Sequence, residues 1–288
     1  MSESPFAVSN PSRITETFTR LKSAGQMAFM PFITVGDPDL ATTRHLIREL
    51  ARRQVDLIEV GFPYSDPIAD GPVIQASYTR ALNQRVRVAD IFQTIATVTA
   101  EGEAEGLRIP PLVAMVSYAL IYRAGVSKFI QQAQQAGFAG LIVPDLPADE
   151  AADLSSHCQT AGLDLIPLLA PTTSAERALR ILQSAMGFVY CISVAGTTGA
   201  RAELPAALHE QLQWLKTQTA LPLAVGFGVS RPEQVQPLRG LADGIIVGSA
   251  LVRYLAAITE EGLAPELAIE NAGLFVADMV AATHQVAM

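Results

Sequence analysis

Two carboxylates have the types and spacing needed for acid–base chemistry. Glu59 interrupts an otherwise apolar run, 57–61, and Asp70 lies in the proline-containing loop that follows. A carboxyl group at the end of a buried strand is partly desolvated, which raises its pKa and lets it both donate and accept a proton near neutral pH. Glu59 could instead form a structural ion pair, and Asp66 and Asp70 could each be a turn or helix-capping residue. The segment is a candidate catalytic loop.

Three small-residue segments later in the chain have the composition of phosphate-binding turns or a lid. Gly226-Phe227-Gly228 directly follows an apolar run, and Gly248-Ser249 opens a helical one. Backbone N–H groups at a helix N-terminus bind phosphate without a basic patch. The third segment, 193–201, has few apolar anchors, which is typical of a mobile lid. Each turn is a weak signal alone, but together they predict a phosphate site.

Eight short apolar runs must position these residues. They are rich in Val, Ile and Leu, as strands buried on both faces are, and helical segments separate them. Strict alternation predicts parallel strands, and eight units in 288 residues match a (β/α)8 TIM barrel of the α/β class. We expect an extra N-terminal helix at 12–24 over the barrel bottom and a C-terminal helix at 266–286. The runs are 28–34, 57–61, 111–117, 140–143, 163–169, 187–193, 221–226 and 244–247, and the helical segments between them include 40–52, 127–136, 147–161, 173–184, 207–219 and 231–241.

An open doubly wound sheet is the alternative fold. It would place a glycine-rich phosphate turn after its first strand, but here that strand is followed by Val35-Gly36-Asp37-Pro38. Barrels commonly bind phosphate with their last loops and place catalytic groups at the carboxyl ends of the strands. The pattern therefore favours a barrel, as a single domain over 1–288 with 1–11 as a flexible N-terminal extension.

Composition argues against several classes of protein and site. The net charge of −8 and the absence of a Lys/Arg cluster argue against nucleic acid or an anionic membrane as a partner. No apolar run reaches membrane-spanning length, and residues 1–11 do not read as a signal peptide. Two distant cysteines fit a reducing cytoplasm. The four histidines fall in helical segments without shared spacing, so neither a metal site nor a Ser–His–Asp triad is predicted.

At these residues the sequence resembles the tryptophan synthase α-chain family, from about Phe18 to about Ala281. The run Ser-Asp-Pro-x-Ala-Asp-Gly-Pro at 65–72 is highly specific to that family, and 31–38, 190–199, 226–228 and 248–249 match further family segments in order. The resemblance implies a lyase of tryptophan biosynthesis that splits indole-3-glycerol phosphate into indole and glyceraldehyde 3-phosphate by retro-aldol cleavage. It implies Glu59 as the general acid–base and Asp70 as the group that recognises indole. The further substrate-binding residues that it implies are Phe32, Thr34, Tyr190, Thr198, Gly199, Gly226, Phe227, Gly228, Gly248 and Ser249.

The resemblance also implies a partner. It implies a β chain that carries pyridoxal phosphate and receives indole, and an α2β2 heterotetramer. For this chain it implies neither a metal nor an organic cofactor. Two positions depart from the family pattern. The first is the segment 117–120, which reads Ser-Tyr-Ala-Leu and includes Ala119; many relatives have an Asn there, and in the family this region faces the β chain. The second is Thr197 in the lid, where a Val is usual.

Three other functions stay open at this point. A free-standing indole-3-glycerol-phosphate lyase would use the same residues without a β partner. A phosphosugar isomerase or aldolase would usually place a Lys or another carboxylate at a strand end, and no Lys lies near one here. In a non-enzymatic phosphate-binding scaffold, the carboxyl group of Glu59 in an apolar strand would lower stability and have no function.

Overall fold

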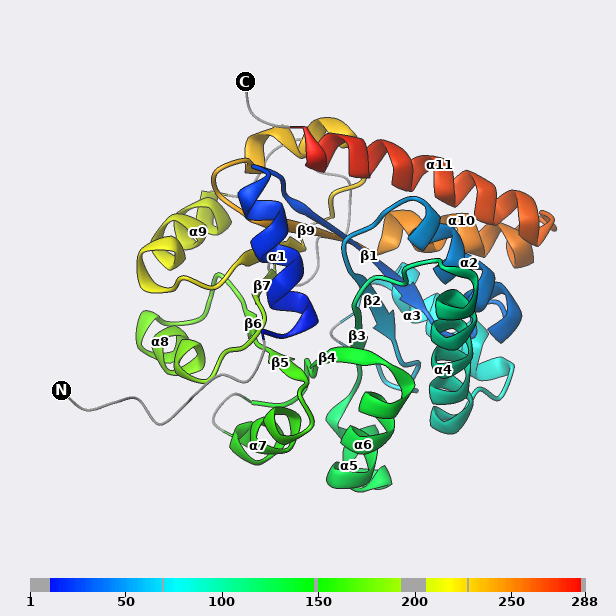
Figure 1. Ribbon diagram of the computed structural model, residues 1–288, viewed down its shortest axis with the longest axis horizontal. Coiled ribbons are helices and arrows are strands. Elements are labelled where there is room, and N and C mark those ends of the chain that lie inside the picture. Colours follow the sequence, from blue (N-terminus) through cyan, green and yellow to red (C-terminus); the bar gives the residue numbers. More distant parts are fainter. Residues whose placement is uncertain (1–10, 69, 148–149, 193–205, 227, 286–288) are drawn as a thin grey trace.

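Parallel strands form a barrel at the centre of the molecule. The computed structural model describes residues 11–68, 70–147, 150–192, 206–226 and 228–285. In these residues nine parallel strands form one sheet in the order β5-β4-β3-β2-β1-β9-β8-β7-β6, and helices surround it (Figure 1). The strands are β1 (Ala28–Thr34), β2 (Ile58–Gly61), β3 (Leu112–Met115), β4 (Phe138–Ile142), β5 (Asp164–Ile166), β6 (Leu168–Leu169), β7 (Val189–Ile192), β8 (Leu223–Gly226) and β9 (Gly244–Val247).

The barrel closes where the fifth predicted strand is interrupted. The run 163–169 forms two strands, β5 paired with β4 and β6 paired with β7. Pro167 separates them, because it has no N–H to donate to a strand ladder. Its carbonyl still accepts a hydrogen bond from the Tyr190 N–H at 2.9 Å. The eight predicted strand positions therefore contain nine strands, and the predicted TIM barrel is confirmed.

Side chains fill the barrel interior, and α1 (Arg13–Ser23) covers its N-terminal end. Ile14, Phe18 and Leu21 of α1 belong to the same buried cluster as inward-facing residues of the strands. The Phe18 ring lies 5.6 Å from that of Phe188. Figure 1 shows α1, in blue, lying across the barrel. The N-terminal helix predicted at 12–24 is confirmed.

The outer helices pack their apolar sides against the strands. The predicted helices agree with the structure within one or two residues, except that α7 begins later than predicted and 231–241 is not an α-helix. Helices α3, α4 and α5 lie where none was predicted. The bounds are α2 (Leu40–Arg52), α3 (Pro72–Asn83), α4 (Val88–Glu105), α5 (Tyr118–Ala124), α6 (Val126–Ala136), α7 (Ala152–Thr160), α8 (Ala175–Gln183), α9 (Ala206–Gln218), α10 (Ser249–Glu260) and α11 (Pro265–His284).

The α-helix predicted at 231–241 is wrong. The segment forms two short 3₁₀ helices, η2 (Pro232–Gln234) and η3 (Gln236–Leu238). Pro237 lacks an N–H, and its ring would clash with the carbonyl of the preceding helical turn, so an α-helix cannot continue through it undisturbed. Short 3₁₀ turns tolerate this sequence because they need few successive hydrogen bonds.

A buried carboxylate at the N-terminal end of the barrel joins α1, β1 and α11. Asp56 precedes β2, and only 1% of its side chain is exposed. It accepts hydrogen bonds from the Arg20 guanidinium at 3.0 Å and from the Phe29 N–H at 3.0 Å. The His284 ring nitrogen Nε2 lies 2.9 Å from Oδ2, the oxygen that also accepts the Phe29 N–H. The first and last described helices are thus held to the barrel by one side chain.

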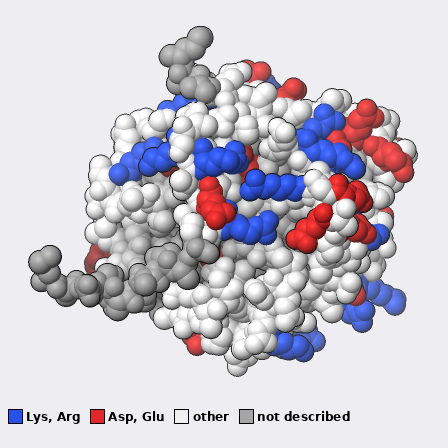
Figure 2. Space-filling model, viewed as in Figure 1, with Lys and Arg blue, Asp and Glu red and all other residues white. Residues whose placement is uncertain are grey.

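Charged side chains of both signs share the surface around this end. On the face seen in Figure 2, Lys and Arg lie close to Asp and Glu rather than in a patch of one sign. Within the described ranges, no helix combines the length and the apolar character needed to cross a bilayer.

Candidate active site

A cavity of about 1120 Å³ lies at the carboxyl ends of the strands. Barrel enzymes place their catalytic groups at this end. The wall includes apolar side chains from the strands and polar groups from the loops that follow them. The predicted site residues that line it are Phe32, Glu59, Asp70, Tyr190, Gly226, Gly228, Gly248 and Ser249.

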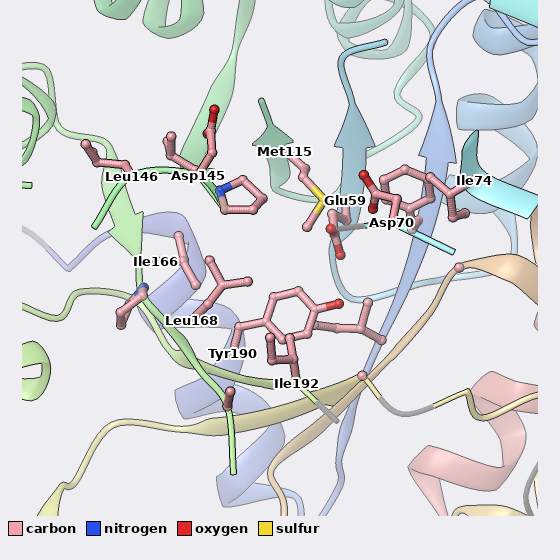
Figure 3. A pocket seen from close by; sticks show the side chains of 18 of the residues that line it. Glu59, Asp70, Ile74, Met115, Asp145, Leu146, Ile166, Leu168, Tyr190 and Ile192 are labelled. Carbon is pink, nitrogen blue, oxygen red and sulfur yellow. The ribbon is translucent and has the colours of Figure 1, made fainter. Parts of the chain in front are cut away.

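Glu59 extends from β2 into this cavity (Figure 3). The residue is 4% exposed, and its Oε2 has no hydrogen-bond partner among the described residues. Burial, with the charge of Asp70 as the second cause, raises the pKa of Glu59 to about 8. The described residues include no cation paired with it, so the structural ion-pair interpretation finds no support. Glu59 carries a proton at neutral pH and can donate it.

Asp70 faces Glu59 from the loop that leads into α3 (Figure 3). Its backbone carbonyl accepts a hydrogen bond from the Gln75 side chain at 2.8 Å, which ties the loop to the helix. Burial raises the pKa of Asp70 to about 6, so at neutral pH it is largely ionised while Glu59 is protonated. Asp66 of the same loop is exposed and accepts a hydrogen bond from Ser65 at 2.6 Å, as a turn residue does.

Tyr190 brings a phenol from β7 to the same side of the cavity (Figure 3). Its hydroxyl lies against Gly226, where a Cβ atom would be only 2.7 Å from Oη. Burial, followed by the charges of Glu59 and Asp70, raises the pKa of Tyr190 well above its ordinary value, so the phenol stays a neutral donor. Glycine at the end of β8 is therefore needed for this tyrosine to reach the carboxyl groups.

Apolar side chains form the opposite wall. In Figure 3, Ile166 and Leu168 lie across the cavity from the two carboxyl groups. Sequence reasoning did not single out this wall, although its members lie in or at the ends of predicted strands. Such a surface suits a flat aromatic ring. Further apolar side chains that line the cavity are Ile192, Ile246 and Met115, and Met115 lies beside Glu59 in Figure 3.

The predicted phosphate turns lie in the loops after β8 and β9. Gly228 has a φ of +87°, a left-handed conformation that favours glycine. Gly248 is the N-cap of α10 and Ser249 its first residue. The start of a helix presents unpaired N–H groups and the positive end of the helix dipole to the cavity. Arg253 also lines the cavity and was not predicted, although it follows Ser249 by four residues and so shares its helix face.

Several predicted residues lie elsewhere. Thr34 is buried outside the cavity wall, and its hydroxyl is 2.7 Å from Ser77 Oγ of α3, so its contact with substrate stays a prediction. Ala119 is exposed in the first turn of α5. Three predicted features lie outside the described residues. They are residues 1–10 of the N-terminal extension, the lid at 193–201 with Thr197, Thr198 and Gly199, and Phe227.

The histidines do not converge on the cavity. Each lies in a helix, as the sequence predicted: α2, α7, α9 and α11. In the part of the chain that the structure describes, no group of three or more His, Cys, Asp or Glu side chains could hold a metal ion.

Comparison with known proteins identifies the family. The model of the family described as tryptophan synthase alpha chain matches residues 18–282. A tryptophan synthase alpha chain of Rhodopirellula baltica is 46% identical over 263 residues, which cover 90% of this chain and 94% of that one. One from Thermoanaerobacter sp. is 43% identical over 245 residues, with 85% and 91% covered.

Solved structures agree. The crystal structure of the tryptophan synthase alpha chain from Legionella pneumophila has a TM-score of 0.83 and 34% identity, covering 95% of this chain and 98% of that one. A chain in the structure of Mycobacterium tuberculosis tryptophan synthase has a TM-score of 0.84 and 32% identity, with 96% and 100% covered. The protein described here belongs to the tryptophan synthase alpha chain family.

Proposed function

We propose that Glu59 and Asp70 divide the proton transfer and the charge stabilisation in cleavage of indole-3-glycerol phosphate. Members of this family are lyases that cleave this compound in tryptophan biosynthesis, and the chain is a lyase of this kind. The observation that supports the two roles is the buried Glu59 carboxyl with an unpaired oxygen, facing a second carboxyl of lower pKa. One group is poised to give a proton, and the other to hold a negative charge.

The reaction begins with proton transfer from Glu59 to C3 of the indole ring. The ring nitrogen then carries positive charge, and the Asp70 carboxylate accepts its N–H and stabilises the cation. The Glu59 carboxylate next takes the proton of the glycerol hydroxyl beside the ring. The electrons of that O–H bond form the aldehyde C=O, the bond to C3 breaks, and its electron pair restores the neutral indole. No external oxidant or reductant is required.

The phosphate of the substrate is bound by the glycine turns in this proposal. Backbone N–H groups near Gly228 and Gly248 and the hydroxyl of Ser249 would hold it at the start of α10. The positive charge of Arg253 lies on the same helix face. Binding the phosphate here leaves the apolar wall and the carboxyl groups to the indole.

The proposed function includes a partner chain. We infer a β chain that carries pyridoxal phosphate and accepts the indole, and an α2β2 assembly, because the relatives carry the name of tryptophan synthase. The free-standing lyase is not favoured by these relatives. The cleavage proposed for this chain needs only proton transfer and charge stabilisation from side chains, so it needs no cofactor of its own. Free, buried Cys158 and Cys191 support a cytoplasmic site of action.

The test is indole formation by the purified chain, with and without its β chain. Glu59→Gln keeps the size of the side chain but removes its acid–base function, so turnover should fall by roughly 10²–10⁴-fold. The matched control is Glu270→Gln, on an exposed position of α11, which should behave as wild type. If Glu59→Gln stays within about threefold of wild type, against that range, the role given to Glu59 is wrong.

A further inference from the structure

A buried hydroxyl behind the cavity wall has no partner. Tyr78 of α3 is 1% exposed, and its Oη forms no hydrogen bond to any described residue. Its ring packs against those of Phe32, at 6.5 Å between centroids, and Tyr64, at 5.5 Å. Burying an unpaired hydroxyl costs stability, and the great majority of buried polar atoms in proteins are paired. An apolar phenylalanine would fill the same space without this cost.

Tyr78 Oη approaches β2 at Gly61, two residues after Glu59. A Cβ atom on Gly61 would lie 3.0 Å from this oxygen, so the absence of a side chain at Gly61 gives the phenol access to the strand. Glu59 is two residues earlier and therefore on the same face of β2, about 7 Å away along the strand. Its side chain has two methylene groups with which to span that gap. Glu59 Oε2 is also buried without a partner.

We propose that Tyr78 is a positioning residue, whose hydroxyl donates a hydrogen bond to the Glu59 carboxylate as Glu59 gives up its proton. This inference rests on the proposed function. While Glu59 is protonated it is neutral, and the phenol can remain unpaired. Once the proton moves to indole C3, a full negative charge develops on a carboxylate that is almost entirely buried. A fixed donor that the Glu59 side chain can reach stabilises the transition state more than the ground state.

The surrounding charges keep Tyr78 a donor. The titratable groups that face Glu59 are Asp70 in the loop before α3, Tyr190 on β7 and Tyr78 itself. Burial, and then the charges of Asp70, Tyr64 and Glu59, raise the pKa of Tyr78 well above its ordinary value, so it keeps its proton. Tyr190 lines the cavity, where its hydroxyl is available to substrate, whereas Tyr78 lies behind the wall. The Tyr78 hydroxyl therefore stays available to donate a hydrogen bond to Glu59 throughout the reaction.

Tyr78→Phe removes only the hydroxyl. We expect kcat for indole formation to fall on the order of 10²-fold, as when one donor to a developing anion is removed. KM should stay within about twofold, because the contact is made only as the charge develops. The alkaline limb of the kcat/KM profile should move up by about one pH unit, since a hydrogen bond to the anion lowers the pKa of Glu59. The melting temperature of the ligand-free variant should not fall.

Tyr254→Phe is the matched control. Tyr254 is a partly buried tyrosine of α10 whose ring stacks on Phe275, with centroids 5.6 Å apart, and loss of its hydroxyl should change neither kcat nor the pH profile. The proposal is overturned if Tyr78→Phe keeps kcat within about twofold, raises KM alone, or lowers the melting temperature without moving the alkaline limb. If the wild-type chain itself forms no indole, the proposed function fails and not this inference alone.

Discussion

Glu59 and Asp70 line the same cavity but have different pKa values. Burial raises the pKa of both, to about 8 for Glu59 and about 6 for Asp70. The larger shift belongs to the group that is more deeply buried and that also feels the charge of its neighbour. Because an acid and an anion are both needed in the first step, this order of pKa values fits the roles given to the two residues.

The order of these pKa values sets the expected pH dependence. Asp70 must be ionised, so kcat/KM should rise as pH increases through about 6, and Glu59 must be protonated, so it should fall as pH increases through about 8. The profile is measured on the single chain with indole-3-glycerol phosphate. A plateau that extends well above pH 8 would contradict protonated Glu59 as the reactive form.

Asp70→Asn tests the charge of the second carboxyl. The amide oxygen can still accept the indole N–H, but it cannot neutralise the cationic ring. We therefore expect kcat to fall by more than KM rises, by on the order of 10²-fold, because the lost interaction is strongest in the transition state. Steady-state kinetics on the purified chain separate the two parameters. A rise in KM with unchanged kcat would make Asp70 a binding residue only.

Some site residues were predictable from sequence and others were not. Glu59 stands out because a charge in an apolar strand is costly, and Asp70 lies in a run specific to one family. Tyr78 and Met115 gave no signal, because each resembles ordinary core residues of a helix or strand. Their importance depends on which atoms of distant segments meet, and spacing along the chain does not contain this information.

At the scale of elements, the start of α10 is the centre of the predicted phosphate site. Ser249→Ala removes one hydroxyl donor, so affinity for glycerol phosphate should fall by roughly 10-fold or more, the value of a hydrogen bond to a charged group. Ser23→Ala, at the end of α1 over the opposite end of the barrel, is the control. Calorimetric titration measures both. Unchanged affinity in Ser249→Ala would place the phosphate elsewhere.

Element boundaries followed local chemistry where the prediction failed. Pro167 divides one predicted strand, and Pro237 prevents the helix predicted at 231–241. Both prolines stand in the sequence, but hydrophobic periodicity alone does not detect their effect on the backbone. Helix α3 begins at Pro72, in agreement with the preference for proline in the first turn of a helix, although no helix was predicted there.

At the scale of the molecule, the buried Asp56 contacts and the proposed catalytic groups lie at opposite ends of the barrel. Asp56→Ala would leave the buried Phe29 N–H unpaired and release Arg20 and His284, so the free energy of unfolding should fall by about 1–3 kcal/mol. Activity below the unfolding transition should be unchanged, because the cavity lies at the other end. Denaturant unfolding and indole formation are measured in parallel.

The control for this variant is the exposed Asp–His pair of α7. Asp153 lies 3.7 Å from His157, and 72% of its side chain is exposed. Asp153→Ala should change stability by no more than about 0.5 kcal/mol, as surface substitutions usually do. Equal losses in the two variants would mean that Asp56 has no special role. The organisation of 1–288 as one domain stays a prediction.

The position of α1 across the barrel has a consequence for the order of folding. The ribosome makes Phe18 and its neighbours before the strands, but they pack in one cluster with Ala224 and Ile246 from strands much later in the chain. Until those strands arrive, the apolar side of α1 lacks part of its native contacts. Long-range contacts of this kind form slowly and late. The helix should therefore dock only as the barrel closes, so that contacts of Phe18 slow unfolding rather than speed folding.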